Sequence, residues 1–216
     1  MHCRYCFRRH FPYADALAAR DHWREALEAL ANDPSIEEAI LSGGDPLSLS
    51  DEKLAEFSQA LDDIPHLRRL RIHTRQPVVL PERVDDRLLD WLGRGRLQKV
   101  IVLHVNHANE LDAAVSAALH RLRALGISLL NQAVLLRNVN DNPGTLINLS
   151  RRLFECGVLP YYLHLLDRVQ GAAHFEVQEE TASMLMRELS SLLPGYLVPR
   201  LVREVAGAPA KTQVPW

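Results

Sequence analysis

The sequence is poor in the features that mark several large classes of protein. Its 216 residues include only three cysteines, too few for the disulfide framework of a small secreted domain. The formal net charge is −2, which gives no reason to expect a nucleic acid partner. No apolar run is long enough to cross a bilayer, and the first residues do not follow the pattern of a signal peptide. These absences favour a reduced, cytoplasmic setting without a membrane.

What the sequence does contain is an alternation of short apolar runs with longer segments of helical period. Strands are predicted at 39–43, 70–74, 99–104, 127–136, 159–166 and 196–202, and helices near 20–32, 51–62, 82–93, 109–125, 143–156 and 178–193. Such alternation predicts an α/β fold with a parallel sheet and right-handed crossovers. A complete eight-unit barrel needs roughly 250 residues. We therefore expect a partial barrel that forms a single domain over residues 1–216.

Polar motifs follow the predicted strands, at the end of the sheet where α/β proteins carry their functional sites. These motifs are SGGDP (42–46), HTRQP (73–77), HVNHANE (104–110) and LDRVQGAAHF (166–175). Because they recur at one end of successive units, the sequence predicts a shared cavity lined from several strands.

Cys3 and Cys6 are three residues apart and can hold one metal centre from a tight loop. Taken alone, this spacing fits a zinc clip completed by His2 or His10, or a redox pair, as well as it fits an iron–sulfur site. Cys156 has no cysteine near it in the sequence and is predicted to be a core residue.

Taken together, the motifs resemble the radical S-adenosylmethionine enzymes and, among them, the lysine 2,3-aminomutase family. In order, they read CRYCFRRHF, SGGDPL, TRQPVVLPERV, NHANE, NQAVLLRNVND, YYLHLLD and AGAPAKT. The resemblance covers nearly all of the chain and implies a TIM-like partial (β/α) barrel with a [4Fe-4S] cluster, S-adenosyl-L-methionine and pyridoxal 5'-phosphate. It also implies that the first of three cluster cysteines, the first strand and the N-terminal helices would precede Met1.

The resemblance assigns roles to individual residues. It implies that Cys3 and Cys6 bind the cluster and that Lys211 forms the Schiff base with pyridoxal phosphate. Arg8 would hold the substrate carboxylate, and the acids at 167 and 204 would surround the distant ammonium of the substrate. These acids are Asp167 and Glu204, the second being a glutamate where the catabolic enzymes carry aspartate. The remaining predicted cofactor-binding residues are Gly43, Gly44, Asp45, Arg75, His107, Asn109 and Gln132.

Four aromatic or imidazole side chains near these motifs receive structural interpretations. At least one of Tyr161 and Tyr162 is predicted to be a core residue, because the two alternate on a strand. His164 and His174 are candidates for pocket residues or for ordinary hydrogen-bonded histidines, and the second interpretation is preferred.

The activity that the resemblance implies is an isomerisation that moves the amino group of L-lysine from C2 to C3. The short tail after Lys211 and the QGAAHF motif favour the subgroup that makes β-lysine for modification of elongation factor P, in a pathway shared with a ligase. A homo-oligomer remains open. The alternatives are a radical aminomutase of another amino acid, a zinc- or pyridoxal-binding module without catalysis, and a catalytically inactive fragment.

Overall fold

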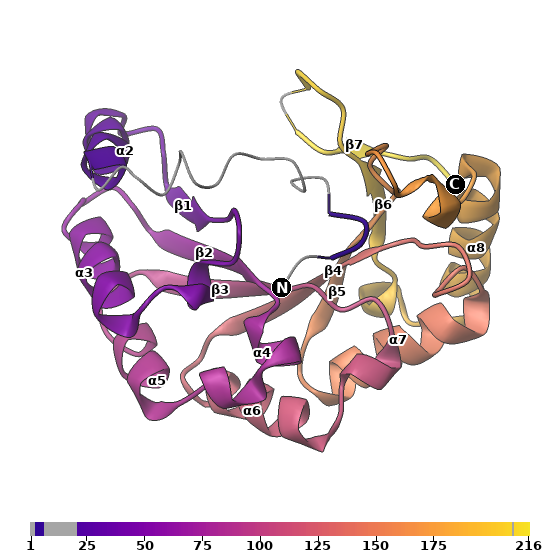
Figure 1. Cartoon of the computed structure of the whole chain (residues 1–216), viewed down its shortest axis with the longest axis horizontal. Helices are drawn as coiled ribbons and strands as arrows, with labels where there is room; N and C mark the ends of the chain where they lie inside the picture. The colour runs from indigo at the N-terminus through magenta and orange to yellow at the C-terminus, as the bar shows by residue number, and fades with distance from the viewer. Residues whose placement is uncertain (1–2, 7–20, 209) are drawn as a thin grey trace.

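A computed structural model describes residues 3–6, 21–208 and 210–216 of the chain, which form one curled sheet with helices on its outer side (Figure 1). The sheet has seven strands in the order β1-β2-β3-β4-β5-β6-β7. The first six pair in parallel and the last pairs antiparallel. Their bounds are Glu38–Leu41 (β1), Arg69–Thr74 (β2), Gln98–Leu103 (β3), Ser128–Val134 (β4), Leu159–His164 (β5), Arg200–Arg203 (β6) and Thr212–Gln213 (β7).

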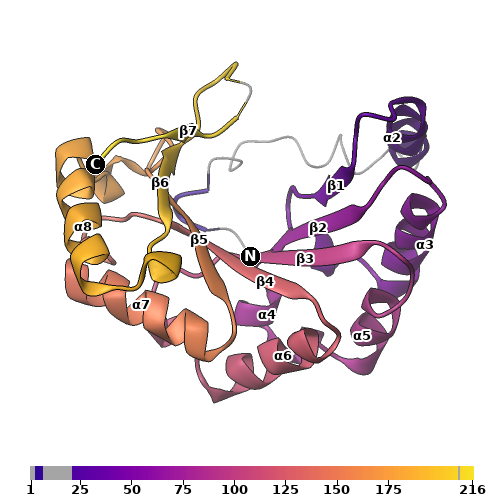
Figure 2. The same cartoon turned by 180° about the vertical axis from the view of Figure 1, so that it is seen from behind.

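The helices lie on the outer side of the sheet, as both views show (Figures 1 and 2), with one helix before β1 in the chain and the others after strands. They are α2 (Asp21–Asn32), α3 (Asp51–Asp62), α4 (Gln76–Val79), α5 (Asp86–Leu92), α6 (Ala113–Ala124), α7 (Pro143–Glu155) and α8 (Glu179–Leu192). Buried leucine, isoleucine and valine side chains join these helices to the sheet in one apolar cluster. The predicted partial barrel is confirmed. Each predicted strand and helix overlaps one in the structure, with bounds that differ by up to a few residues.

Local sequence signals explain where several helices begin. Asn142 caps α7, because its side-chain oxygen accepts a hydrogen bond from the backbone N–H of Thr145 at 2.9 Å, and Pro143 occupies the first helical position. The helix α3 begins at Asp51, at the start of the predicted helix. Ser50 is the capping residue and Asp51 is the first helical residue, where a negative charge is favourable.

The two faces of the sheet differ in polarity. Along β2 the buried residues are Leu70, Ile72 and Thr74, whereas Arg71 and His73 alternate with them and are less buried. Because successive strand residues point to opposite faces, these polar side chains lie on the concave face. A parallel sheet covered on both faces reads as a continuous apolar run, so the alternation indicates that the concave face serves as a polar surface.

Three local features differ from the sequence prediction or were absent from it. The strand predicted to begin at 196 begins at Arg200, because Gly195–Leu197 forms a 3-10 turn and the following Pro199 has no backbone donor. The strand β7 was not predicted, since two residues are too few to show a period. In β5 the pairing moves from Pro160 to Tyr162 while β4 advances by one residue, which leaves Tyr161 as a bulge.

None of the helices in the described ranges combines the length and the apolar character that a membrane crossing requires.

Candidate functional site

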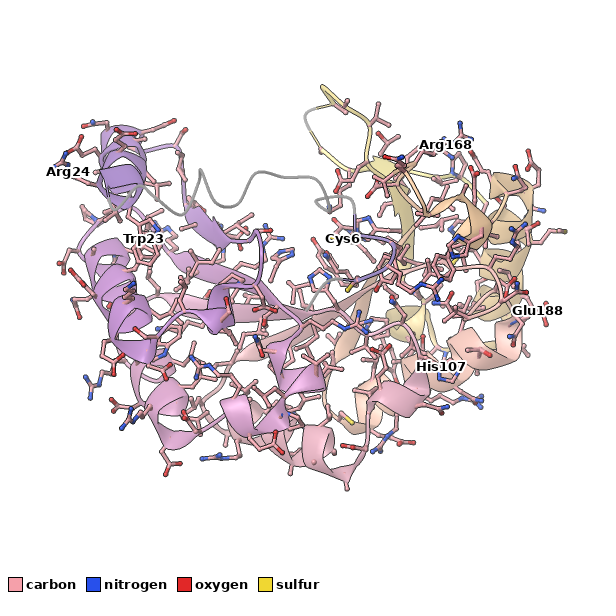
Figure 3. All side chains as sticks on the ribbon, in the orientation of Figure 1. Cys6, Trp23, Arg24, His107, Arg168 and Glu188 are labelled. Carbon is pink, nitrogen blue, oxygen red and sulfur yellow. The ribbon has the colours of Figure 1, made fainter. Side chains whose placement is uncertain are left out.

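The cysteine loop lies against the residue that follows β2. A hydrogen bond of 3.1 Å from the Cys6 N–H to the Cys3 carbonyl closes the loop, and both thiols are free and half-buried. Cys6 lies on the open, concave side (Figure 3). The Nη1 atom of Arg75 donates to Cys3 Sγ at 3.4 Å and to the Tyr5 hydroxyl at 2.9 Å. The loop is therefore fastened to the end of β2 by one guanidinium.

Arg75 is itself held by an acidic partner. Its Nη2 atom forms an ion pair with Glu110, which lies in the 3-10 turn after β3. Burial acts to lower the pKa of Arg75, but the neighbouring Tyr5, Glu110 and Cys3 together raise that pKa. The guanidinium is thus a fixed positive charge beside the cysteines.

Two buried asparagines extend this arrangement to the next strand, and sequence reasoning missed both. Asn106 donates to the Tyr5 hydroxyl and accepts from the Val134 N–H at 2.8 Å. Asn140 is fully buried and donates to the Asn106 and Val134 carbonyls at 3.0 and 2.9 Å, while it accepts from the Leu136 N–H at 2.7 Å. These bonds join the ends of β3 and β4.

The HVNHANE motif contains a capping box between His107 and Glu110. Glu110 accepts from the backbone N–H of His107 at 3.0 Å and of Asn106 at 2.7 Å. The predicted cofactor contacts His107 and Asn109 instead make a local bond, in which the Asn109 N–H donates to His107 Nδ1 at 3.1 Å. Asn109 is exposed. Both roles in cofactor binding stay predictions.

The glycine loop follows β1 and is fastened to β2 by Asp45. Gly43 has a φ of 133°, a conformation that side-chain-bearing residues rarely adopt. One carboxylate oxygen of Asp45 accepts from the Thr74 hydroxyl at 2.7 Å, and the other accepts from the Arg75 N–H at 2.7 Å. Asp45 therefore anchors polar groups at the ends of β1 and β2, while Gly44 lies beside it in the same loop.

Three histidines lie on the concave face close to one another. Burial, as the largest cause, lowers the pKa of His73 to about 3 and the pKa values of His104 and His164 to about 4. The rings of His73 and His104 are 6.0 Å apart, and Gln132 Nε2 lies 3.3 Å from His104 Nε2. Within the described part of the chain, His73 Nε2, His164 Nε2 and Gln132 Oε1 are buried without a hydrogen-bond partner.

Lys211, Glu204 and Asp167 come together at the rim of the same face. Lys211 forms an ion pair with Glu204, and its Nζ atom lies 5.7 Å from the centre of the Tyr162 ring. Burial and then the charge of Glu204 raise the pKa of Asp167, against the opposing effect of Lys211. The fold thus brings together an amine and two carboxylates, although Asp167 and Lys211 are more than forty positions apart in the sequence.

The structure agrees with some of the predictions for the neighbouring aromatic and imidazole residues and not with others. Tyr161 and Tyr162 are both half-buried with ring centres 3.8 Å apart, so the prediction that one of them is a core residue is wrong. The Nε2 atom of His164 has no partner among the described residues, so the interpretation of His164 as an ordinary hydrogen-bonded histidine stays a prediction. His174 does have a partner, Arg4, at 3.5 Å. Cys156 is fully buried, as predicted.

The predicted carboxylate-binding Arg8 lies outside the described residues, as do His2 and His10, so the zinc clip has no structural description.

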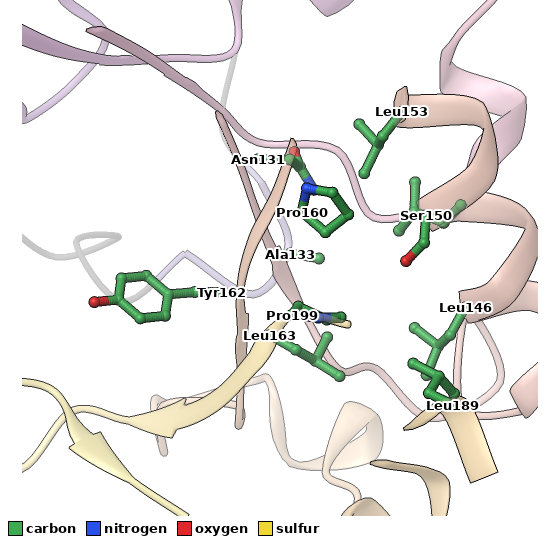
Figure 4. A pocket seen from close by; sticks show the side chains of 11 residues that line it. Asn131, Ala133, Leu146, Ser150, Leu153, Pro160, Tyr162, Leu163, Leu189 and Pro199 are labelled. Carbon is green, nitrogen blue, oxygen red and sulfur yellow. The ribbon is translucent and has the colours of Figure 1, made fainter. Parts of the chain in front are cut away.

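A small pocket on the other side of the sheet is a feature of the core. It lies between β4, β5 and α7, and its lining is mostly apolar, including Leu146, Leu153 and Leu189. In Figure 4 the Tyr162 ring points away from these side chains. The lining also contains Ser150 and Asn131, but the Asn131 side chain is bonded to the Val105 backbone. The pocket is therefore a packing feature of the core, and the Tyr162 ring belongs to the opposite, concave face.

The donor sets decide which groups the concave face can hold. Across residues 3–6, 21–208 and 210–216, no three histidine, cysteine or acidic side chains are grouped as metal ligands. On the concave face the described residues supply two cysteine thiols, those of Cys3 and Cys6, whereas the resemblance implies three cysteine ligands for a cluster. The Lys211 end fits pyridoxal phosphate better, because an amine, an aromatic ring and buried polar atoms without partners lie together there.

Comparisons with known proteins agree with the resemblance. No family model matches the sequence. The chain is 53% identical over 212 residues to an L-lysine 2,3-aminomutase of Escherichia coli, and 51% identical over 212 residues to one of Haemophilus influenzae. Each match covers 98% of this chain, but only 62% and 63% of those relatives. A relative of the same name from Clostridium subterminale is 34% identical.

Solved structures with low sequence identity share the fold. A radical SAM methyltransferase from Sphaerobacter thermophilus has a TM-score of 0.53 at 19% identity and covers 93% of this chain and 59% of its own. A spore photoproduct lyase with bound AdoMet has a TM-score of 0.58 at 13% identity, covering 93% of this chain and 72% of its own. The chain thus shares the partial-barrel fold of these two proteins. Over nearly all of its own length, the chain is similar in sequence to proteins named L-lysine 2,3-aminomutase, and it spans about three fifths of the length of the first two.

Proposed function

We propose that this chain forms the substrate-binding and pyridoxal phosphate-binding part of a lysine 2,3-aminomutase, which converts L-lysine into β-lysine. The observation that carries the proposal is the group formed by Lys211, Glu204 and Asp167 on the concave face, in a chain 53% identical to a protein of that name. The sequence match supports the reaction class. The geometry supports a substrate with a cationic end.

In this proposal the two acids select the substrate. A substrate ammonium left without a partner in a closed site would cost roughly 3–5 kcal/mol, which favours lysine over glutamate. Asp167 is the more enclosed acid, whereas 48% of the Glu204 side chain is exposed. Because exposed pairs contribute only about 0–1 kcal/mol, we expect Asp167 to supply most of the selectivity.

The cofactors would supply the chemistry, and the protein would bind and shield them. When bound, S-adenosylmethionine with an iron–sulfur cluster supplies a radical, and pyridoxal phosphate supplies a ring that can delocalise the unpaired electron. Cys3 and Cys6 would provide two cluster thiolates. Lys211 would hold the pyridoxal carbonyl, and Tyr162 would lie against the bound group. The curled sheet would limit the access of water to the concave face.

The product would serve the modification of elongation factor P. The QGAAHF motif and the short tail after Lys211 support this use, in which a ligase would attach β-lysine to that protein.

The test is anaerobic turnover of L-lysine by the protein with reconstituted cluster, S-adenosylmethionine, pyridoxal phosphate and a reductant. We expect β-lysine to form. If S-adenosylmethionine is cleaved but lysine returns unchanged, the radical class stands and the substrate is another amino acid. If neither occurs, the proposed activity is wrong for this chain.

Two substitutions separate the proposed roles. Lys211→Ala should abolish the absorbance band of protein-bound pyridoxal phosphate, and a retained band would contradict the role of Lys211. Asp167→Asn should weaken the binding of lysine more than that of pyridoxal phosphate, as measured by titration of each. Equal losses would argue against selection by Asp167.

A further inference from the structure

The ion pair between Glu204 and Lys211 is set by the backbone as well as by the side chains. Glu204 directly follows β6, and Lys211 directly precedes β7. The two strands pair antiparallel with Arg203 opposite Thr212. The next residue along each strand is therefore Glu204 on one side and Lys211 on the other, which keeps the carboxylate and the amine side by side.

Asp167 lies within electrostatic range of both groups. Glu204 acts to raise the pKa of Asp167 and Lys211 acts to lower it, so both paired charges act on the Asp167 carboxyl. Asp167 comes from the loop after β5, whereas the pair comes from β6 and β7. The rim therefore carries two carboxylates but a single nearby lysine, and Glu204 is the acid that this lysine holds.

We propose that Glu204 is shared between Lys211 and the cationic end of the substrate, so that binding of an aldehyde to Lys211 releases Glu204 for the substrate. While the amine is free, its ammonium form occupies Glu204. When the amine has reacted, Glu204 joins Asp167 as an acceptor for the incoming cation. The inference rests on the proposed function, because it takes the aldehyde to be pyridoxal phosphate.

The chemistry of the release balances without a further reactant. The Lys211 ammonium first gives one proton to water, and the amine nitrogen then attacks the aldehyde carbon. The two remaining nitrogen-bound hydrogens leave with the aldehyde oxygen as water, and a carbon–nitrogen double bond forms. That nitrogen can carry at most one proton, whereas the ammonium carried three. Glu204 therefore loses most of the hydrogen bonds that Lys211 offered.

This arrangement couples the two ligands. Because the aldehyde must displace Glu204 from Lys211 and the cation needs Glu204 free, each ligand raises the affinity for the other by the same factor. The size of that factor is limited by exposure, since 48% of the Glu204 side chain and 27% of the Lys211 side chain are exposed. For such a pair we expect a factor of about three to five.

The experiment titrates the protein with pyridoxal phosphate and follows the absorbance of the adduct. It is repeated with n-butylguanidinium, a cation that does not condense with aldehydes, and with n-butylurea, its neutral isostere. In the wild-type chain we expect butylguanidinium to lower the Kd for pyridoxal phosphate by about threefold to fivefold. Butylurea should leave the Kd unchanged.

Two variants locate the effect. Glu204→Gln should bind pyridoxal phosphate at least as tightly as the wild type and should show no response to butylguanidinium. The control is Glu179→Gln, which removes the acid that pairs with Arg203, the residue beside Glu204, and should keep the full response. Thermal unfolding of each variant checks that it is folded.

The outcomes separate the coupling from the proposed function. A response that is absent from the wild type, or equal in the wild type and Glu204→Gln, overturns the sharing of Glu204 while a bound adduct leaves the proposed function standing. Borohydride reduction followed by mass spectrometry locates the adduct. If Lys211 carries none, the proposed pyridoxal site falls and the coupling falls with it.

Discussion

The buried histidines of the concave face make the stability of the protein depend on pH in a defined direction. His164 is 8% exposed, and burial together with the charge of Lys211 lowers its pKa from 6.5 to about 4. The unfolded chain therefore takes up a proton on His164 at a higher pH than the folded chain does. Stability from this residue is complete above pH 6.5 and is lost as the pH falls toward 4.

The magnitude follows from the two pKa values. Between pH 7 and pH 5, a histidine with a pKa of 6.5 unfolded and about 4 folded loses about 2 kcal/mol of unfolding free energy. Replacing His164 with glutamine removes the titrating group, so the drop in unfolding free energy between these pH values should be about 2 kcal/mol smaller than in the wild type.

Urea unfolding at pH 7 and pH 5 measures this difference directly. The control is His120→Gln, because the His120 side chain is exposed on α6 and is solvated in the folded and the unfolded chain alike. Its pH dependence should match that of the wild type. If the His164→Gln and wild-type curves fall in parallel, His164 is not held neutral by burial and the reasoning is refuted.

Three further substitutions test the packing around the site. Asn140→Ala should lower the free energy of unfolding by about 2–3 kcal/mol, because it leaves buried backbone groups without partners; a loss under 0.5 kcal/mol in urea unfolding would contradict this. Gly157→Ala should cost about 1 kcal/mol in the same assay, because φ is 73° and a Cβ atom would lie 2.3 Å from the Arg123 side chain. His73→Phe should raise the unfolding free energy at pH 7 by about 1 kcal/mol, since its Nε2 atom is buried without a described partner. A decrease would mean that this nitrogen is satisfied in solution.

The sequence predicts the fold well because the two periodicities are clean. The helix α6 has leucine and valine residues at helical spacing, and Gly126 lies shortly after its last residue. The polar motifs were also found at the correct end of the sheet, since the ends of parallel strands coincide. Such reasoning fails where a structure has no period of its own. The two-residue strand β7 and the bulge at Tyr161 are set by contacts with neighbouring strands.

The site was predicted less completely, because polar residues within one motif make different kinds of contact. In HVNHANE, sequence reasoning selected His107 and Asn109, whereas Asn106 and Glu110 make the contacts that reach the cysteine loop. Residue type alone does not separate them. The spacing of His107 and Glu110 fits the capping box. The partners of the Asn106 side chain are Tyr5 and Val134, which are distant in the sequence and come close only in the fold.

The position of His104 shows that the two ends of the chain serve one surface. After burial, the charges that lower its pKa are those of Arg75 and Lys211. Arg75 contacts Cys3, and Lys211 is paired with Glu204. A single imidazole is therefore within electrostatic range of both the cysteine end and the lysine end. Arg75 and Lys211 therefore lie near the same imidazole on the concave face. That proximity is what the proposed function requires, because it places the cysteine end and the lysine end beside one imidazole.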